Sequence, residues 1–244
     1  MRTRPAPLLC ELHAHSTWSD GVLSLPELVD LYGGLGFDAL CVTDHTCRSD
    51  DPWLPEQERG PRAVHAGNHA EYLEELELEA ARARDRYGLL LLPGLELTWN
   101  DLDPLRAAHA LALGLRTFVS VDDGLEAALT EARAAGAAIV AAHPFADEAD
   151  SSAARTTRRF SHDREALMPL VDRYELFNRT RLFGWVEEAR LPFVACGDFH
   201  RLEHLAGWKT LVPCAKDEQT LVGYLRSELP VYLTRLDIDE RVAA

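Results

Sequence analysis

Nine side chains of types that bind metal ions lie along this chain in short, ordered clusters. Almost every cluster falls at the end of an apolar stretch that reads as a β-strand. Imidazoles and carboxylates that converge at one end of a barrel can hold two or three divalent cations, and such sites mostly carry out hydrolysis. The nine are His13, His15, Asp20, His45, Glu96, His109, His143, Asp198 and His200.

The spacing inside two clusters suits shared coordination of one ion. Residues two apart in a strand point to the same side of it. His13 and His15 can therefore hold one ion together. Asp198 and His200 repeat this geometry from another strand. Glu96 is suited to a bridging position, because a carboxylate offers its two oxygens to two cations.

The other ligands come from separate segments. Asp20, in the motif SDG, can return from the loop after the first strand, with Gly21 allowing the turn. His45 ends the motif TDH, and His109 and His143 supply neutral nitrogens from neighbouring strands. Mixed nitrogen and oxygen ligation suits zinc, manganese or iron(II).

Each cluster has a simpler explanation when it is taken alone. An HxH pair is common without metal binding, Asp198 could cap a turn, and Glu96 could pair with an arginine. The metal interpretation rests on the recurrence of ligand-type residues near predicted strand ends. His65 and His69 lack this context, because they open a polar, acidic segment, which favours a solvated helix face.

Short apolar strands alternate with helical segments, the pattern typical of a parallel α/β sheet or barrel. Ser24 and Glu27 form a capping-box pattern at the start of the first helix. We expect strands at 8–13, 39–43, 89–97, 109–115, 137–143, 174–177, 192–197 and 210–213. We expect helices at 24–36, 69–87, 123–135, 163–173, 182–189 and 217–227.

Two segments, 46–64 and 146–162, resist assignment to a helix or a strand. Loops of this length are uncommon unless they are functional or disordered. Both follow ligand-bearing strand ends, where barrel enzymes place substrate loops. The sequence therefore favours a substrate-contacting role for them, with disorder as the alternative.

The composition fits one domain, with a core over about 8–230 and a C-terminal tail at 231–244. No apolar run is long enough to span a membrane, and no signal peptide is expected. The five cysteines show no CxxC pairing, so buried apolar thiols and a cytoplasmic location are expected. A net charge of −15 disfavours duplex nucleic acid as a partner. It does not exclude a small anionic substrate, because bound cations would make the pocket positive.

The motifs in their order, HxH, SDG, TDH, GxE, H, HP and GDxH, resemble the polymerase-and-histidinol-phosphatase (PHP) family from Leu8 to about Val212. The resemblance implies a distorted (β/α)7 barrel with a trinuclear metal site at the C-terminal face of the strands. One ion would be held by His13, His15, Glu96 and Asp198. A second would take Glu96, His109 and His143, and the third Asp20, His45 and His200.

The resemblance further implies a metal-dependent phosphoesterase that hydrolyses small phosphomonoesters with a metal-activated water. Asp198, His200 and Glu96 are expected to take part in catalysis. Asp44, beside His45, is expected to orient an imidazole from outside the ligand shell.

Substrate phosphate is expected to meet arginines on two segments that follow strand ends. The candidates are Arg155, Arg158 and Arg159 after His143, and Arg179 and Arg181 after Asn178, led by Arg158, Arg159 and Arg179. Asn178 also looks like the family's asparagine after the fifth strand and is a further substrate-binding candidate.

Two other functions remain open. A dinuclear metal-dependent deoxyribonuclease or amidohydrolase also begins with HxH, and many amidohydrolases bridge their metals with a carbamylated lysine from the middle of the barrel. The lysines here, Lys209 and Lys216, both follow the GDFH motif, which disfavours that version. The other alternative is a non-catalytic metal-binding module.

Overall fold

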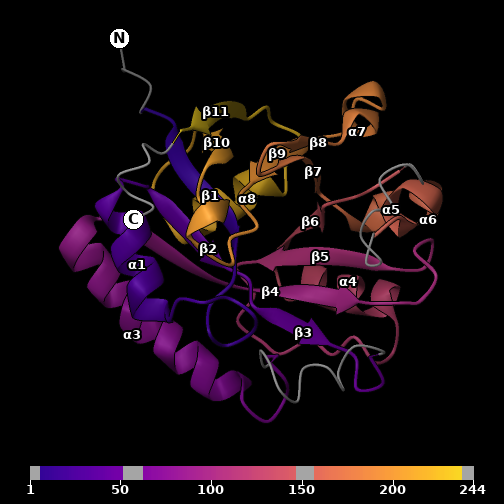
Figure 1. The fold of residues 1–244 in the computed structure, drawn as a ribbon, viewed down its shortest axis with the longest axis horizontal. Helices are drawn as coiled ribbons and strands as arrows, with labels where there is room; N and C mark the ends of the chain where they lie inside the picture. The colour runs from indigo at the N-terminus through magenta and orange to yellow at the C-terminus, as the bar shows by residue number, and fades with distance from the viewer. Residues whose placement is uncertain (1–5, 52–62, 147–156, 238–244) are drawn as a thin grey trace.

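The computed structural model describes residues 6–51, 63–146 and 157–237. Its centre is one mixed sheet of 11 strands that curls like half of a barrel, with α1 and α3 side by side along one flank (Figure 1). The strands are β1 (Leu8–Ala14), β2 (Ala39–Val42), β3 (His45–Cys47), β4 (Leu90–Trp99), β5 (Ala108–Leu113), β6 (Ala138–Ala142), β7 (Arg173–Asn178), β8 (Arg181–Leu182), β9 (Phe193–Cys196), β10 (Gly207–Val212) and β11 (Tyr232–Leu236).

The strand order is β11-β10-β1-β2-β4-β5-β6-β7-β8, with β3 beside β4 and β9 beside β7. β1, β2 and β4 run parallel, as do β6, β7 and β9. β5 runs antiparallel to both of its neighbours, and β10 runs antiparallel to β1. The sheet is therefore mixed, where the alternation of strands and helices predicted a parallel sheet or barrel. The short connection from β4 to β5 contains no crossover helix, so the chain must return antiparallel.

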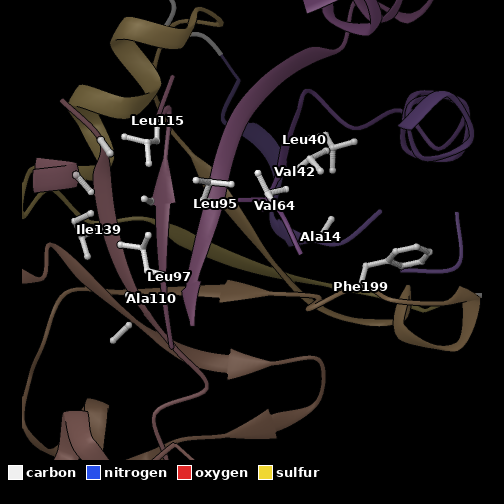
Figure 2. Packing of buried hydrophobic residues seen from close by; sticks show 14 of the residues in the cluster. Ala14, Leu40, Val42, Val64, Leu95, Leu97, Ala110, Leu115, Ile139 and Phe199 are labelled. Carbon is white, nitrogen blue, oxygen red and sulfur yellow. The ribbon is translucent and has the colours of Figure 1, made fainter. Parts of the chain in front are cut away.

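The curl brings β1 to the segment that follows β9. Phe199 forms an isolated parallel bridge with Ala14, and the two side chains lie close together in Figure 2. The Phe199 N–H donates to the His13 carbonyl at 3.1 Å, and the His15 N–H donates to the Phe199 carbonyl at 2.8 Å. These bonds place two ligand-bearing segments side by side at one edge of the sheet.

Two apolar layers fill the two faces of the sheet. In β2, Leu40 and Val42 belong to the layer that includes the buried residues of α1 and α3, part of which Figure 2 shows from close by. Ala39 and Cys41 instead join a second layer of leucine, valine, alanine and cysteine side chains. Alternate residues of one strand thus enter opposite layers, which explains why the strands read as continuous apolar runs. Cys10, Cys41 and Cys196 are buried, as expected.

The helices mostly follow the sequence expectations. Glu27 accepts hydrogen bonds from the backbone N–H and the hydroxyl of Ser24, which confirms the capping box. The helix expected at 163–173 is broken, because Pro169 lacks the N–H that an α-helix needs. The helices are α1 (Leu25–Gly34), α3 (His69–Tyr87), α4 (Leu125–Ala134), α5 (Arg159–His162), α6 (Arg164–Leu167), η2 (Met168–Leu170), α7 (Gly184–Glu188), η3 (Leu202–His204) and α8 (Glu218–Leu225).

Two further points concern the predicted boundaries. Tyr232–Leu236 forms β11 along β10, so this part of the expected C-terminal tail belongs to the sheet. Within the described ranges, no helix is both long and apolar enough to cross a bilayer.

Candidate metal centre

Glu96 of β4 lies at the centre of the site and is almost completely buried. Its Oε1 lies 3.1 Å from His109 Nδ1 and 3.2 Å from His143 Nε2. Its Oε2 lies 2.9 Å from His45 Nδ1 and 3.3 Å from His15 Nε2. One carboxylate therefore touches imidazoles from four different segments, as a bridging group would.

The HxH pair and Asp198 meet beside this carboxylate. The Nε2 atoms of His13 and His15 lie 3.0 Å apart, as their two-residue spacing predicted. Asp198 Oδ1 lies 3.4 Å from His13 Nε2 and 3.7 Å from His15 Nε2. The pair and the DxH motif thus reach one point from β1 and from the end of β9.

Asp20 returns to the site through the tight turn that follows β1. Its Oδ1 lies 3.1 Å from His200 Nε2, 3.5 Å from His45 Nε2 and 3.7 Å from His15 Nδ1. A Cβ atom at Gly21 would clash with the backbone of His15, so the turn requires glycine. All nine predicted ligands therefore converge at one edge of the sheet.

The strand directions explain this convergence. His13, Asp198 and His143 lie at or just beyond the ends of their strands, whereas His109 lies near the start of β5. Because β5 is antiparallel, its start lies at the edge where the parallel strands end. Glu96 does not end its strand as expected, since β4 continues to Trp99 and pairs Glu96 with His45 of β3.

Each imidazole also has a hydrogen-bond partner for its other nitrogen, and for all but His200 that partner lies outside the nine candidate ligands. An outer acceptor fixes which ring nitrogen carries the proton and leaves the other lone pair free for a metal. His45 is a special case, because its Nδ1 contacts both Thr98 and Glu96. Its Nε2 faces Asp20. The outer contacts are His13 Nδ1 to Glu175, 2.8 Å; His15 Nδ1 to Ser19, 3.3 Å; His45 Nδ1 to Thr98, 2.7 Å; His109 Nε2 to Asn100, 3.0 Å; His143 Nδ1 to Thr157, 3.0 Å; and His200 Nδ1 to the Asp198 carbonyl, 3.0 Å.

The electrostatics keep Glu96 ionised and His15 neutral, whereas the neighbouring carboxylates, against the effect of burial, raise the pKa of His13 and His45. Burial alone would raise the pKa of Glu96, but His45 and His13 hold it well below its usual range. Burial, together with the neighbouring His200 and His45, lowers the pKa of His15 to about 3, so its imidazole is neutral at neutral pH. Glu96 Oε2 is buried and has no hydrogen bond from the described residues. A buried, ionised oxygen without a donor suits a cation.

The candidate ligands form three sets, and within each set the ligand atoms all lie within 4.8 Å of one another. The first contains the Asp20, His45 and His200 set implied by the PHP resemblance, with His15 added. The second contains most of the set implied for another ion but lacks Asp198. The third has His45 where the resemblance implied His143. The sets are His15–Asp20–His45–His200, His13–His15–Glu96 and His45–Glu96–His109.

The cluster opens into a pocket of about 580 Å³. The turn from β7 to β8 supplies one wall through Asn178, Arg179, Thr180 and Arg181. Arg179 donates to Asp198 Oδ2 at 2.9 Å, while Arg181 lies 5.1 Å from the ring centre of Phe145. Asn178 and two arginines predicted to bind substrate therefore reach the pocket.

The other predicted arginines do not line it. Arg158 donates to the Ala146 carbonyl, and Arg159 forms ion pairs with Glu126 and Asp163. Neither residue is among those that line the pocket, and Arg159, where α5 starts, pairs with Glu126 of α4. Contact of Arg158 or Arg159 with substrate phosphate stays a prediction. Arg155 lies outside the described residues.

The role expected for Asp44 also needs correction. Asp44 accepts hydrogen bonds from Ser16 and Ser19 rather than from an imidazole. It acts on His15 only through the Ser19 hydroxyl, which bonds both groups. The carboxylate outside the nine candidate ligands that directly contacts one of their imidazoles is Glu175, at His13 Nδ1. A glutamate inside the apolar strand YELFN was the available signal for it.

Three residues of the site have a positive backbone φ angle, which residues other than glycine rarely adopt. His143 has φ 30°, Asp198 has φ 46° and Arg179 has φ 55°. Such conformations persist where surrounding contacts over-determine them, which is common at functional sites. One such contact is the bond from the His143 N–H to Glu175 Oε2 at 2.7 Å.

No protein-family model and no curated protein sequence matches this chain. Solved structures do match. A two-domain protein from Bacteroides vulgatus containing a predicted PHP-like metal-dependent phosphoesterase aligns at TM-score 0.66 and 18% identity, over 95% of this chain and 67% of that chain. A candidate metal-dependent phosphoesterase from Bifidobacterium adolescentis aligns at TM-score 0.50 and 16% identity, over 82% of this chain and 90% of that chain.

An amidohydrolase from Chromobacterium violaceum, solved with sulfate and no metal, aligns at TM-score 0.50 and 17% identity, over 78% of this chain and 87% of that chain. Identities this low establish the fold. This chain has the fold of PHP-like metal-dependent phosphoesterases, as the order of its motifs indicated.

Proposed function

We propose that this protein is a metal-dependent phosphoesterase with a trinuclear centre in a distorted (β/α)7 barrel, and that it hydrolyses small phosphomonoesters. One observation carries the proposal. Five imidazoles are held by acceptors outside the nine candidate ligands and His200 by the Asp198 carbonyl, and each directs a nitrogen at the carboxylates of Glu96, Asp198 or Asp20. The fold shared with PHP-like phosphoesterases supports the same conclusion.

The residues present fit divalent ions. Glu96 would bridge, with the HxH pair and Asp198 on one side, His109 and His143 on another, and the set of Asp20, His45 and His200 completing the centre. Bound zinc, manganese or iron(II) would supply Lewis-acid charge and activate water near neutral pH. The ionised Glu96 and the neutral His15 need no proton transfer before ligation, whereas His13, His45 and His200, whose pKa values are raised, would release a proton when metal binds.

The wall of the pocket would bind the substrate. Arg179 and Arg181 line the same pocket as the cluster and would hold phosphate oxygens, since a guanidinium matches them with paired donors. Asn178 donates its amide to Glu175 Oε2 at 2.9 Å, which ties the wall to the partner of His13. Phe145 and Phe183 pack edge to face beside the arginines and exclude water from that side.

A dinuclear amidohydrolase is the second candidate, favoured by the fold shared with the Chromobacterium violaceum protein. Lys209 cannot bridge metals in that way, because it is fully buried against Glu11. Lys216 pairs with Asp38, which precedes the start of β2, whereas the candidate ligands lie at the edge where the parallel strands end. A Glu96-bridged dinuclear centre would leave Asp20 and His200 without a role.

Metal analysis and a substrate panel test the proposal. The purified protein should bind about three divalent ions per chain, whereas a dinuclear enzyme would bind two. Manganese-, zinc- or iron(II)-loaded protein should hydrolyse small phosphomonoesters, and chelation should abolish the activity. Full loading without turnover across phosphomonoesters, phosphodiesters and amides would instead indicate a non-catalytic metal-binding module.

A further inference from the structure

Directly behind the metal-binding edge lies a buried ion pair that takes no part in the cluster. Lys209 Nζ donates to Glu11 Oε2 at 2.6 Å, and both side chains are fully buried. Isolated buried charges are costly, so a pair in this position needs further hydrogen bonds. Glu11 has them, because its Oε1 accepts the Gly197 N–H at 2.7 Å and the Leu12 N–H at 3.1 Å.

The pair lies in a seam between β1 and β9, where no continuous ladder of backbone hydrogen bonds joins the two strands. β9 pairs with β7 on one side, but on the β1 side only the single bridge from Ala14 to Phe199 joins the strands. Side chains of β1 and of its neighbour β10 complete the rest of this seam, which we call the β1–β9 seam. Thr210 Oγ1 bonds both the N–H and the carbonyl of Ala195 at 2.8 Å, and Glu11 bonds Gly197.

Glu11 bonds the chain next to two metal-ligand positions at once. The Gly197 N–H precedes Asp198, and the same Oε1 lies 3.3 Å from the backbone nitrogen of His13. The pairing of β1 with β2 is irregular between Glu11 and Ala14, so the ladder alone does not fix this stretch. A Cβ atom at Gly197 would clash with Glu11 Oε2 and Lys209 Nζ, so glycine is needed for the pair to pack against this strand.

We propose that Glu11 and Lys209 are a positioning pair that sets the placement of Asp198 relative to His13. The pair thereby sets the affinity of the site for the ion held between these two residues and the coordination geometry of that ion. This rests on the proposed metal centre. The Glu11 side chain is long enough to accept hydrogen bonds from both strands. Lys209 holds the Glu11 carboxylate in place and neutralises its charge. The pair contacts neither substrate nor metal.

Two conservative sets of substitutions separate reach from charge. Glu11→Asp keeps the charge but is one methylene shorter, so it cannot bond both Lys209 and Gly197. Glu11→Gln with Lys209→Met keeps an oxygen at the original distance and removes both charges. Thr210→Val is the matched control, because it removes seam bonds to Ala195 without touching Gly197.

The readouts are cobalt(II) affinity and the visible absorption spectrum of the cobalt-loaded protein. Glu11→Asp should weaken cobalt binding about 10- to 100-fold, as losing a group that orients a ligand does, and should alter the spectrum. The Gln/Met double variant should keep the wild-type affinity and spectrum. Thr210→Val should lower the thermal unfolding temperature and leave the spectrum unchanged. Gly197→Ala, which displaces the same carboxylate, should behave like Glu11→Asp.

Two results would overturn the proposal: wild-type cobalt affinity and spectrum in Glu11→Asp, or an equal loss in the Gln/Met double variant. A wild-type protein that binds no cobalt would refute the metal centre itself. In that case amide hydrogen exchange still tests the positioning. Exchange at 197–200 should be faster in Glu11→Asp and unchanged in the double variant, and unchanged rates in both would reject it.

Discussion

Residues 157–162 and 178–182 both carry arginines and both follow the metal-binding edge, yet they present those arginines in opposite ways. Arg159 pairs with Glu126 of α4 and with Asp163, outside the pocket. Arg179 pairs with Asp198, inside it. Arg159 and Arg179 thus point toward the carboxylates that lie nearest to them. Their position after a strand end does not by itself predict whether they enter the pocket.

The largest expected effect comes from Asp198, the carboxylate that holds the inward arginine. Asp198→Asn removes the charge that faces His13 but keeps an oxygen for Arg179. We expect hydrolysis to fall by several orders of magnitude with loss of bound metal, measured by steady-state kinetics and metal analysis. Asparagine is preferred to alanine here because it tolerates the left-handed backbone, with φ at 46°.

Asp198→Ala should lose at least as much rate while the circular dichroism spectrum stays native, since the carboxylate serves the site rather than the core. Wild-type turnover with full metal content in either variant would contradict the proposed centre.

The next effect tests the inward arginine. Arg179→Ala should lower kcat/KM for phosphomonoesters about 10- to 100-fold, from the loss of roughly 1.5–3 kcal/mol for a charge-assisted hydrogen bond. Metal content should not change. Arg179→Lys is the control, because it keeps the charge and loses the paired donors, so it should recover only part of the loss. An unchanged kcat/KM in Arg179→Ala would mean that the arginine serves only Asp198.

The smallest effect belongs to the outward arginine. Arg159→Ala should leave kcat/KM within about 2-fold of wild type. It should lower the free energy of unfolding by only about 0.2–1 kcal/mol, because Glu126 is half exposed and such pairs are weak. Glu126→Gln breaks the same ion pair from the other side and should give the same small change in chemical denaturation. A tenfold loss of kcat/KM in Arg159→Ala but not in Glu126→Gln would show that the Arg159 side chain does contact the substrate.

The elements that could be predicted from sequence are those with strong local patterns. All eight expected strands exist, because each is a short apolar run that must be buried on both faces. The three that escaped notice, β3, β8 and β11, are short or partly exposed, and neighbouring strands hold them in place. The direction of β5 was also hidden, since nothing in an apolar run encodes its orientation.

The partners of the ligands were harder to predict than the ligands. Ser19, Thr98, Asn100 and Thr157 are ordinary polar residues whose role depends on an imidazole being nearby. His69 was expected on a solvated helix face, but it is buried and packs near Phe118. These contacts depend on how distant segments pack, which local periodicity does not report.

The sequence by itself determined which side chains of metal-binding type could act together, because residue type and two-residue spacing are local properties that strands preserve. It therefore identified the nine side chains that the fold brings together. Only the tertiary structure decided what holds them. Glu175 lies 162 positions from His13, and Glu11 lies 186 positions from Gly197 and 198 from Lys209. Contacts over such separations arise from the curl of the sheet, which no local pattern specifies.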